Sequence, residues 1–331
     1  MAADDRPCFA ALDFGSNSTL LSVACMDSAG TLREEIEKFC TTRLGSGVDE
    51  TGFLAPRGID KSIAAADQFL QFLRLNYRNR NVLLVTAATS AVRDARNRRI
   101  FLHACLELFG TEPLILTGEE EAETVFLGAA SSLPADCECV VIDIGGGSSE
   151  VAVGTPGACK AACSLQVGCV RLAELFNLKE EFNLDQLNSA RKYVRRQCEA
   201  YVERVLLKAD RQNADPGVKV VVTGGTATTL ASFHEALTNY DRCRVHGFGA
   251  TERYVSGVLE RLSAVSAAQR AAMPGLPADR AEVWPAGLVI LSELLRYLHK
   301  NDFTVSTRGL RFGLIKSLAQ GEIEDEYIVN P

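Results

Sequence analysis

The sequence predicts an α/β protein made of two similar domains, and three observations support this prediction. The chain has 331 residues, which is longer than one hydrophobic core usually serves. Apolar runs typical of strands alternate along it with segments whose apolar residues recur at helical spacing. A short pattern, in which an apolar run ends in an aspartate and a small-residue turn, occurs twice. The repetition indicates that the two halves share one architecture.

The repeated pattern lies at residues 10–19 and again at 140–149. The first copy reads AALDFGSNST and the second VVIDIGGGSS, so Asp13 and Asp143 hold equivalent positions. Each copy continues into an alternating strand, which predicts a hairpin whose turn exposes backbone N–H groups. A third segment, VVVTGGT at 220–226, runs from a strand through a glycine turn into a helix. We expect two related domains that face one another across a cleft.

Between the two copies, helices and strands alternate. Ile59, Ile63 and Leu70 fall on one face of the first helix. Gly110 ends the second helix, because glycine readily adopts the left-handed conformation that closes a helix. The expected elements are helix 59–75, strand 82–86, helix 95–109, strand 114–116 and a helix that begins at Thr117.

The alternation continues in the second half, which supports the α/β class. Pro285 is compatible with the first turns of a helix. Acidic residues at 322–326 indicate a solvated end. The expected elements are a long amphipathic helix at 185–208, strand 218–223, helix 279–300, strand 303–306 and a last helix at 310–319.

Composition excludes several classes of protein. The net charge of -7 disfavours bulk nucleic-acid binding, and no apolar run is long enough to cross a membrane. The first apolar stretch contains Asp13 and does not resemble a signal peptide. The eleven cysteines contain no Cys-x-x-Cys pair, and the four histidines are scattered. We therefore predict buried, reduced thiols and a cytoplasmic protein that binds neither nucleic acid nor membrane.

The run Gly145-Gly146-Gly147-Ser148-Ser149 is the strongest candidate for binding an anion. Glycines let the backbone approach a phosphate closely, so that several N–H groups converge on it. The alternative is a tight hairpin with no ligand, but three glycines after an aspartate exceed what a turn needs. The sequence lacks both the P-loop pattern and the Gly-x-Ser-x-Gly pattern, which excludes those classes of enzyme.

Carboxylates at strand ends are candidate metal ligands. Asp13 and Asp143 each end an apolar strand, where a carboxylate is unfavourable unless it is paired or metal-bound. Mg²⁺ is typically held by one or two carboxylates together with phosphate oxygens, and Asp143 and Glu150 could flank such an ion. The alternative is that the aspartates cap their own turns.

Glu121 and Arg93 are candidate catalytic residues. Glu119, Glu120 and Glu121 open a helix, where Thr117 and Glu120 could form a capping box, or one glutamate could deprotonate an attacking water. Arg93 follows a strand and a small-residue loop, which suits a bidentate phosphate clamp, whereas a surface arginine is the alternative. Arg171 and Arg311 are weaker clamp candidates, and Trp284 is expected to pack in the core.

Seven segments together resemble the exopolyphosphatase/guanosine pentaphosphate phosphohydrolase (Ppx/GppA) family. They occur in family order along nearly the whole chain. The segments are LDFGSNS at 12–18, ATSAVR at 88–93, TGEEEA at 117–122, VIDIGGGSSE at 141–150, QVGCVR at 166–171, TGGT at 223–226 and GLRFG at 309–313.

The resemblance implies the actin/Hsp70/sugar-kinase superfold, with two ribonuclease H-like domains and the active site between them. The first domain is expected at 1–126, with a C-terminal helix in 309–331 that packs back on it, and the second at 127–308. Two departures stand out: the sequence ends without the HD-type extension of long members, and Ser306-Thr307-Arg308 replaces a common Ser-Asp-Gly.

The resemblance also assigns roles to residues. Glu121 is then the catalytic base, Arg93 the phosphate clamp, and Asp143 and Glu150 the ligands of Mg²⁺, with Asp13 at the equivalent position and Mn²⁺ as an alternative metal. The expected phosphate-binding residues are Gly15, Ser16, Asn17, Ser18, Gly145, Gly146, Gly147, Ser148, Gly224, Gly225 and Thr226.

The resulting hypothesis is an exopolyphosphatase that releases orthophosphate from the end of inorganic polyphosphate by in-line attack of water. The main alternative is the same chemistry on guanosine pentaphosphate. More distant alternatives are a kinase of the same superfold and a polyphosphate or nucleotide sensor without turnover. The protein is expected to be a monomer or a homodimer.

Overall fold

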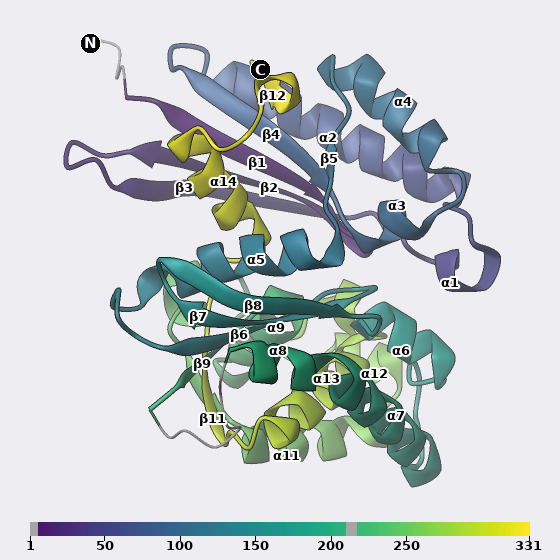
Figure 1. Ribbon diagram of the computed structural model, residues 1–331. Coiled ribbons are helices and arrows are strands. Elements are labelled where there is room, and N and C mark those ends of the chain that lie inside the picture. The colour runs from purple at the N-terminus through teal and green to yellow at the C-terminus, as the bar shows by residue number, and fades with distance from the viewer. Residues whose placement is uncertain (1–5, 210–216) are drawn as a thin grey trace. The chain divides into compact units, whose positions relative to one another are not determined.

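The computed structural model describes residues 6–209 and 217–331 (Figure 1). The chain divides into two compact units. The first unit extends to Thr117 and includes Leu310–Pro331, and the second is Gly118–Gly309. The division precedes helix α5 (Gly118–Ala129), which packs on strands of the second unit, whereas the boundary predicted from the sequence follows residue 126.

The first unit is a mixed sheet with helices. Its strand order is β12-β4-β1-β2-β3, and β5 also pairs with β4. Helix α2 packs on β2 and on α4, and α14 packs on β1, β2 and β4. The strands are β1 (Cys8–Phe14), β2 (Ser18–Met26), β3 (Leu32–Thr41), β4 (Val82–Ala88), β5 (Leu114–Ile115) and β12 (Ile328–Val329). The helices are α1 (Val48–Thr51), α2 (Pro56–Asn76), α3 (Ser90–Asp94), α4 (Arg98–Phe109), α14 (Leu310–Gln320) and the 3₁₀ turn η4 (Asp325–Tyr327).

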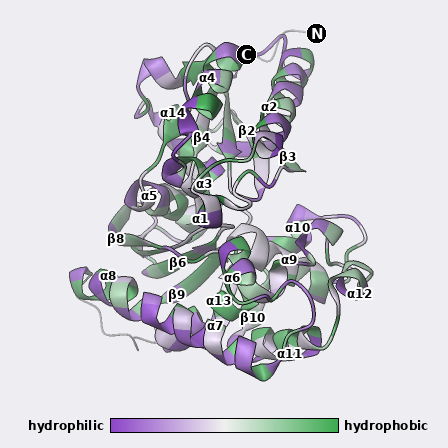
Figure 2. Cartoon of the chain, turned by 90° about the vertical axis from the view of Figure 1, so that its right-hand side faces the viewer, coloured by the Kyte–Doolittle hydropathy of each residue, from purple (hydrophilic) through white to green (hydrophobic). Residues whose placement is uncertain are grey.

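The sheet of the second unit has the order β10-β11-β9-β6-β7-β8. Its strands are β6 (Cys139–Ile144), β7 (Ser149–Thr155), β8 (Ala158–Leu165), β9 (Lys219–Thr223), β10 (Gly249–Thr251) and β11 (Asp302–Val305). The helices after α5 are η1 (Ala130–Ser132), α6 (Cys169–Leu175), α7 (Leu184–Gln197), η2 (Cys198–Val202), α8 (Glu203–Lys208), α9 (Gly224–His234), α10 (Arg242–Val245), α11 (Glu252–Ser263), α12 (Ala267–Ala271), η3 (Ala278–Arg280) and α13 (Trp284–Tyr297). Figure 2 shows the central strands β6 and β9 as hydrophobic, as expected for a buried sheet, and α7 as largely hydrophilic.

The two units repeat one topology. In each, the first strand pairs antiparallel with the second and parallel with the fourth, as β1 does with β2 and β4, and β6 with β7 and β9. A later strand then joins the fourth in parallel, as β5 joins β4 and β11 joins β9. This order is the ribonuclease H-like arrangement, and its duplication in one chain is the build of the actin/Hsp70/sugar-kinase superfold. The predicted fold class is confirmed.

Several elements differ from those predicted. Strands β3 and β8 were not expected, and helix α13 begins at Trp284 rather than at residue 279, with Pro285 in its first turn. The expected helix 185–208 is helical throughout but contains the π-helical turn η2. The acidic tail is followed by β12, which pairs antiparallel with β4, so this end of the chain is part of the first sheet.

One pair of cysteines corrects the expectation of reduced thiols. Cys8 and Cys25 form a disulfide, since they lie directly opposite one another in the register of β1 and β2. The other nine cysteines are free, and five of them are buried. The bond follows from the register of the hairpin formed by β1 and β2, which pairs Cys8 with Cys25 across 17 residues of sequence.

The helices of the described ranges, 6–209 and 217–331, are too short or too polar to cross a membrane. The apolar side chains instead form one buried cluster in each unit.

Candidate active site

The two predicted phosphate turns have the same backbone geometry. The N–H of Gly15 donates to the carbonyl oxygen of Ser18 at 3.0 Å, and the N–H of Gly145 donates to that of Ser148 at 3.0 Å. A Cβ on either glycine would lie 3.1 Å from the serine carbonyl oxygen, which is tighter than an ordinary contact. An alanine at either position would force the serine carbonyl to shift by a few tenths of an ångström, so each turn favours its leading glycine.

Glu150 interacts electrostatically with two other acidic side chains of the second unit, Glu121 and Asp143. Asp143 lies opposite Glu150 in the antiparallel register of β6 and β7, so both side chains project from the same face. Glu150 and Glu121 are buried, with 2% and 7% of their surface exposed. Burial raises the pKa of Glu150 well above its usual range, and the charges of Glu121 and Asp143 raise it further. A bound cation or a proton would relieve this repulsion.

Ser164 on β8 orders this acidic cluster. Its hydroxyl donates to Glu150 Oε1 at 2.7 Å, and hydrogen bonds from Ser164 and Ser148 partly oppose the rise in the pKa of Glu150. A Cβ on Gly118 would lie 2.6 Å from the Cβ of Ser164. Because Gly118 is the first residue of α5, this close packing fixes the turn of the helix that carries Glu121.

The first turn of α9, which opens with Gly224 and Gly225, lies against the same cluster. Gly224 has a φ of 83°, and a Cβ at this position would be 2.2 Å from Asp143 Oδ1. Thr223, the last residue of β9, pairs with Asp143 in parallel register. The segment 224–226, which is predicted to bind phosphate, therefore starts next to Asp143, a predicted metal ligand.

Arg280 is a site residue that sequence reasoning missed. A Cβ on Gly225 would fall 2.0 Å from its Nη1, so the half-buried guanidinium lies directly on this glycine turn. Burial raises the pKa of the Cys169 thiol. The charge of Arg280 lowers this pKa and the charge of Asp143 raises it, so both charged groups lie near the thiol. Arg280 is far from Gly225 in sequence, so no local motif marked it.

The turn of the first unit has its own polar contacts. Ser16 Oγ lies 3.0 Å from Ser90 Oγ, and the Asn17 amide donates to Ser18 Oγ at 3.2 Å. Asp13 holds the position of Asp143, but Leu20 lies opposite it where the second unit has Glu150. The first repeat thus keeps the turn and one aspartate without the second acid.

Each predicted arginine bonds a group of its own unit. Arg93 lies in α3, where its Nη1 donates to the carbonyl oxygen of Leu116 at 2.9 Å. Arg171 donates to Gln166, and Arg311 bonds Ser22 and Glu37. The sequence-predicted residues therefore form two groups, with Asp13, the turn 15–18 and Arg93 in the first unit, and Glu121, Asp143, the turn 145–148, Glu150 and Gly224–Thr226 in the second.

Two acidic side chains of the second unit are suited to supply part of the ligand shell of a magnesium ion. Across the described ranges, no group of three or more histidine, cysteine, aspartate or glutamate side chains is arranged to hold a metal. Mg²⁺, however, usually takes one or two carboxylates and completes its shell with water and substrate phosphates. Asp143 and Glu150, opposed on one strand pair and crowded by Glu121, provide a carboxylate pair of this kind.

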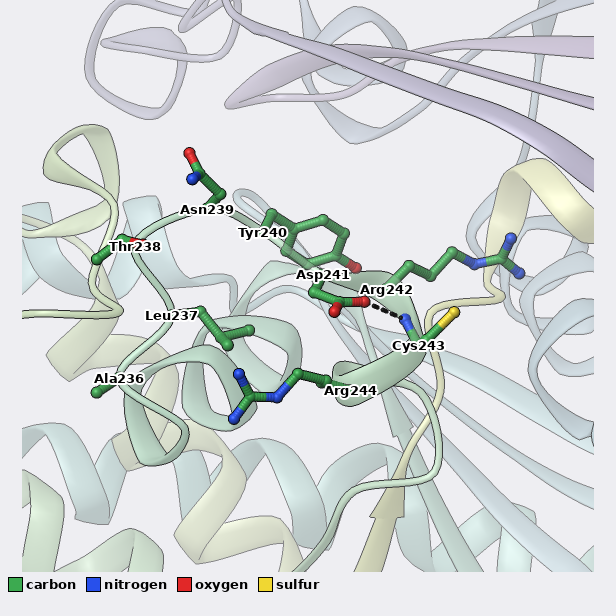
Figure 3. Close-up of a pocket in the computed structure, with 9 residues that line it drawn as sticks. All are labelled: Ala236, Leu237, Thr238, Asn239, Tyr240, Asp241, Arg242, Cys243 and Arg244. Atoms are coloured by element: carbon green, nitrogen blue, oxygen red, sulfur yellow. Dashed lines mark hydrogen bonds between the residues drawn. The ribbon is translucent and has the colours of Figure 1, made fainter.

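A cavity of about 510 Å³ lies elsewhere in the second unit (Figure 3). It is lined by residues 236–244, between α9 and the end of α10. None of the residues predicted from the sequence lines it.

The fold and the site define a class: a duplicated ribonuclease H-like protein with glycine turns suited to phosphate and a cluster of buried carboxylates. The sequence matches the model of the Ppx/GppA phosphatase family over residues 29–322. The chain belongs to the Ppx/GppA phosphatase family, as its motifs predict.

Individual relatives match over most of this chain. The chain is 32% identical over 323 residues to Exopolyphosphatase 2 of Mycobacterium tuberculosis, which covers 94% of this chain and 98% of that protein. It is 29% identical to the guanosine-5'-triphosphate,3'-diphosphate pyrophosphatase of Vibrio campbellii, covering 95% of this chain but only 59% of that protein. A crystal structure of the Aquifex aeolicus family member has a TM-score of 0.77 at 27% identity, covering 97% of this chain and 100% of the other.

Proposed function

We propose that the protein is an exopolyphosphatase that hydrolyses the terminal phosphate of inorganic polyphosphate to orthophosphate. The carrying observation is the buried group of Glu121, Asp143 and Glu150 beside the glycine turn that begins at Gly224. The similarity to a protein named exopolyphosphatase extends over 98% of its length, which favours this substrate. The second candidate is guanosine pentaphosphate, which is favoured by the match to the Vibrio campbellii pyrophosphatase.

Glu121 is the proposed general base. It lies in the first turn of α5, buried and within electrostatic reach of Glu150. A carboxylate held there can take the proton from a water molecule as that water attacks the terminal phosphorus. The packing of Gly118 on Ser164 fixes the helix and so holds the carboxylate in one place.

Asp143 and Glu150 are the proposed ligands of Mg²⁺, with Mn²⁺ as an alternative metal. When bound, the ion would offset the charge that builds on the phosphate oxygens. The chain itself contributes the opposed carboxylates on β6 and β7, and the hydroxyl of Ser164, which orients Glu150.

The remaining groups are proposed to bind phosphate oxygens. Backbone N–H groups of the turns 145–148 and 224–226 suit this role, because converging amides favour an anion. Arg280 adds a guanidinium at the second of these turns. We extend the role to the first-unit turn at 15–18 and to Arg93, on the ground that this unit repeats the fold and the turn geometry of the second. Asp13, at the position equivalent to Asp143, is proposed as a further metal ligand, because a carboxylate repels phosphate oxygens.

The test measures phosphate release from polyphosphate and from guanosine pentaphosphate with Mg²⁺, and transfer from ATP to sugars. Glu121→Gln should lower kcat by roughly 10²–10⁴-fold, the range for loss of a general base. Glu123→Gln, an exposed glutamate on the same helix, is the matched control and should keep wild-type activity. Chelation of divalent metal should stop turnover, and added Mg²⁺ should restore it.

Release from neither phosphate substrate would refute the hydrolase proposal, and sugar phosphorylation would favour the kinase alternative. Binding of polyphosphate without turnover would favour a sensor. Unchanged activity of Glu121→Gln would remove this residue from the mechanism.

We also propose a cytoplasmic location for a monomer or homodimer that binds neither nucleic acid nor membrane. Nine of the eleven cysteines are free, which suits a reducing compartment better than an oxidising one. Light scattering of the purified protein would distinguish the two oligomeric states.

A further inference from the structure

We propose that residues 167–171, named the support segment, position the turn 145–148 so that its backbone amides face a phosphate group. The support segment leads from strand β8 into helix α6 and belongs to the motif QVGCVR, to which the proposed function assigns no role. The proposal rests on the function proposed above, because it concerns the same phosphate turn. Residues of the support segment act on the substrate only through that turn.

Backbone amides of the support segment hold the carbonyl groups of the turn. The N–H of Cys169 donates to the carbonyl oxygen of Gly145 at 2.9 Å. The N–H groups of Val170 and Arg171 both donate to the carbonyl oxygen of Gly146, at 2.9 and 3.2 Å. Three successive amides therefore bind two successive carbonyl groups of the turn.

These hydrogen bonds determine where the amides of the turn point. In a trans peptide the C=O of one residue and the N–H of the next residue face opposite ways. Because the support segment binds the carbonyl groups of Gly145 and Gly146, the N–H groups of Gly146 and Gly147 are directed away from it. In the part of the chain that the structure describes, neither of these N–H groups donates to a protein atom. Both are therefore available to the oxygens of a phosphate group.

The support segment is fixed against both ends of the turn. A Cβ on Gly168 would lie 2.3 Å from the carbonyl oxygen of Gly146, so a larger residue would displace the backbone of the turn. Ser149, the residue after the turn, is fully buried, and its hydroxyl donates to the carbonyl oxygen of Val167 at 2.6 Å. The support segment thus contacts the turn where it begins and where it ends.

The first unit contains the same device at the segment that follows β3. There the N–H of Gly45 donates to the carbonyl oxygen of Ser16 at 2.8 Å. The N–H groups of Thr42 and Arg43 donate to the carbonyl oxygen of Asn17, at 3.1 and 2.9 Å. A Cβ on Gly45 would lie 2.8 Å from the Cβ of Ser16, so a glycine again packs directly on the turn.

The duplication argues that the bonds serve the turn rather than the local path of the chain. Strands β3 and β8 are the third strands of the two repeats, so the two segments occupy equivalent places. Their sequences differ, TTRLG at 41–45 and QVGCVR at 166–171. Both nevertheless direct three amides at two successive carbonyl groups of a turn that is proposed to bind phosphate.

The first experiment displaces the turn with Gly168→Ala and measures the binding of orthophosphate, the proposed product, by calorimetry with Mg²⁺ present. The dissociation constant for orthophosphate and the KM for polyphosphate should each rise roughly 10–100-fold, as loss of hydrogen bonds to a charged group predicts. Gly154→Ala is the matched control, because its Cβ would lie 2.2 Å from the carbonyl oxygen of Ala158, a comparable clash at the far end of β7. Both variants should lose stability, but Gly154→Ala should bind orthophosphate as wild type does.

The second experiment removes one amide without disturbing the helix. Cys169 is the first residue of α6, where proline is accepted, and Gly168 before it is extended, with φ −130° and ψ 169°, as suits a residue that precedes proline. Cys169→Pro therefore deletes the hydrogen bond to Gly145, whereas Cys169→Ala keeps it and removes only the thiol. Orthophosphate binding should be roughly 10-fold weaker in the proline variant than in the alanine variant.

The outcomes separate the positioning role from the proposed function. Weaker orthophosphate binding in Gly168→Ala and Cys169→Pro, but not in Gly154→Ala, supports the role even if wild type hydrolyses neither phosphate substrate, a result that refutes only the function. Wild-type affinity and KM in Gly168→Ala and Cys169→Pro overturn the role and leave the function standing. An equal loss in Gly154→Ala also overturns it, because the defect would then follow from lost stability. If Gly168→Ala does not fold, the comparison of Cys169→Pro with Cys169→Ala decides.

Discussion

The hydroxyl of Ser164 donates to Glu150 Oε1 at 2.7 Å, so a residue of β8 orients a predicted metal ligand on β7. The same serine fills the space in which a side chain on Gly118 would lie. One side chain therefore couples the acidic pair on the sheet to the start of the helix that carries the proposed base.

We predict that Gly118→Ala lowers both activity and stability. The new Cβ would lie 2.6 Å from the Cβ of Ser164, and overpacking of this kind typically costs about 1–3 kcal/mol. The start of α5 must shift to relieve the contact, and Glu121 shifts with it. Chemical denaturation and the kcat for phosphate release measure the two effects.

The double variant Gly118→Ala/Ser164→Gly separates the two roles of Ser164. Removing the serine side chain makes room for the alanine, so the free energy of unfolding should return toward wild type. Activity should stay low, because Glu150 has lost the hydrogen bond from Ser164. Full recovery of activity would show that this hydrogen bond does not matter for catalysis.

We predict that Arg280→Ala lowers kcat/KM by roughly 10–100-fold, in the range for loss of a strong charge-assisted bond to phosphate. Its guanidinium lies on the Gly225 turn, where substrate oxygens are proposed to bind. Arg280→Lys should recover only part of this loss, since an ammonium group cannot make two parallel hydrogen bonds. Arg204→Ala, an exposed arginine on α8, is the control. Activity within twofold of wild type for Arg280→Ala would exclude the role.

The sequence predicted the parts of the site that depend on local chemistry. Asp13 and Asp143 end apolar strands and precede glycine-led turns, so both turns could be placed from neighbouring residues alone. Arg280 and the Ser164–Glu150 bond depend on which strands and helices become neighbours, which no local pattern encodes. Strand β3 was missed because charged residues occupy much of this half-exposed edge strand, which obscures its apolar alternation.

We predict that stability decreases at alkaline pH because of buried thiols. Burial raises the pKa of Cys163 and of Cys198 to about 12, whereas a thiol in the unfolded chain ionises near about 8.5. The folded state therefore keeps protons that the unfolded state releases. These two thiols stabilise the folded state fully below the pKa of a thiol in the unfolded chain. This stabilisation is lost as the pH rises from that value toward about 12.

The measurement is urea denaturation at several pH values between neutral and about 10, with a reductant present. The double variant Cys163→Ala/Cys198→Ala is the comparison, because it lacks both titrating groups and should show a shallower loss of stability with pH. Identical slopes for the two proteins would contradict the assignment to these thiols.

The side chain of Arg270 is fully buried in the second unit, with 0% of its surface exposed. Its guanidinium donates to the carbonyl oxygens of Leu262, Lys179, Glu180 and Ala281, and so joins the end of α11 to two loop segments around one charge. Arg270→Met should cost about 3 kcal/mol or more, because it leaves these buried carbonyls without donors. Arg270→Lys should recover only part of the loss, since one ammonium group cannot reach all four oxygens.

Chemical denaturation of both variants gives the free energies of unfolding, with Arg261→Met as the control. Arg261 contacts the ring of Phe233 from outside the core, so its replacement should cost less than about 1 kcal/mol. The free energy of unfolding should therefore be highest for wild type, lower for Arg270→Lys and lowest for Arg270→Met. A loss below about 1 kcal/mol for Arg270→Met would mean that water or neighbouring groups satisfy the four carbonyls without the arginine, and that its charge is not what holds these loops together.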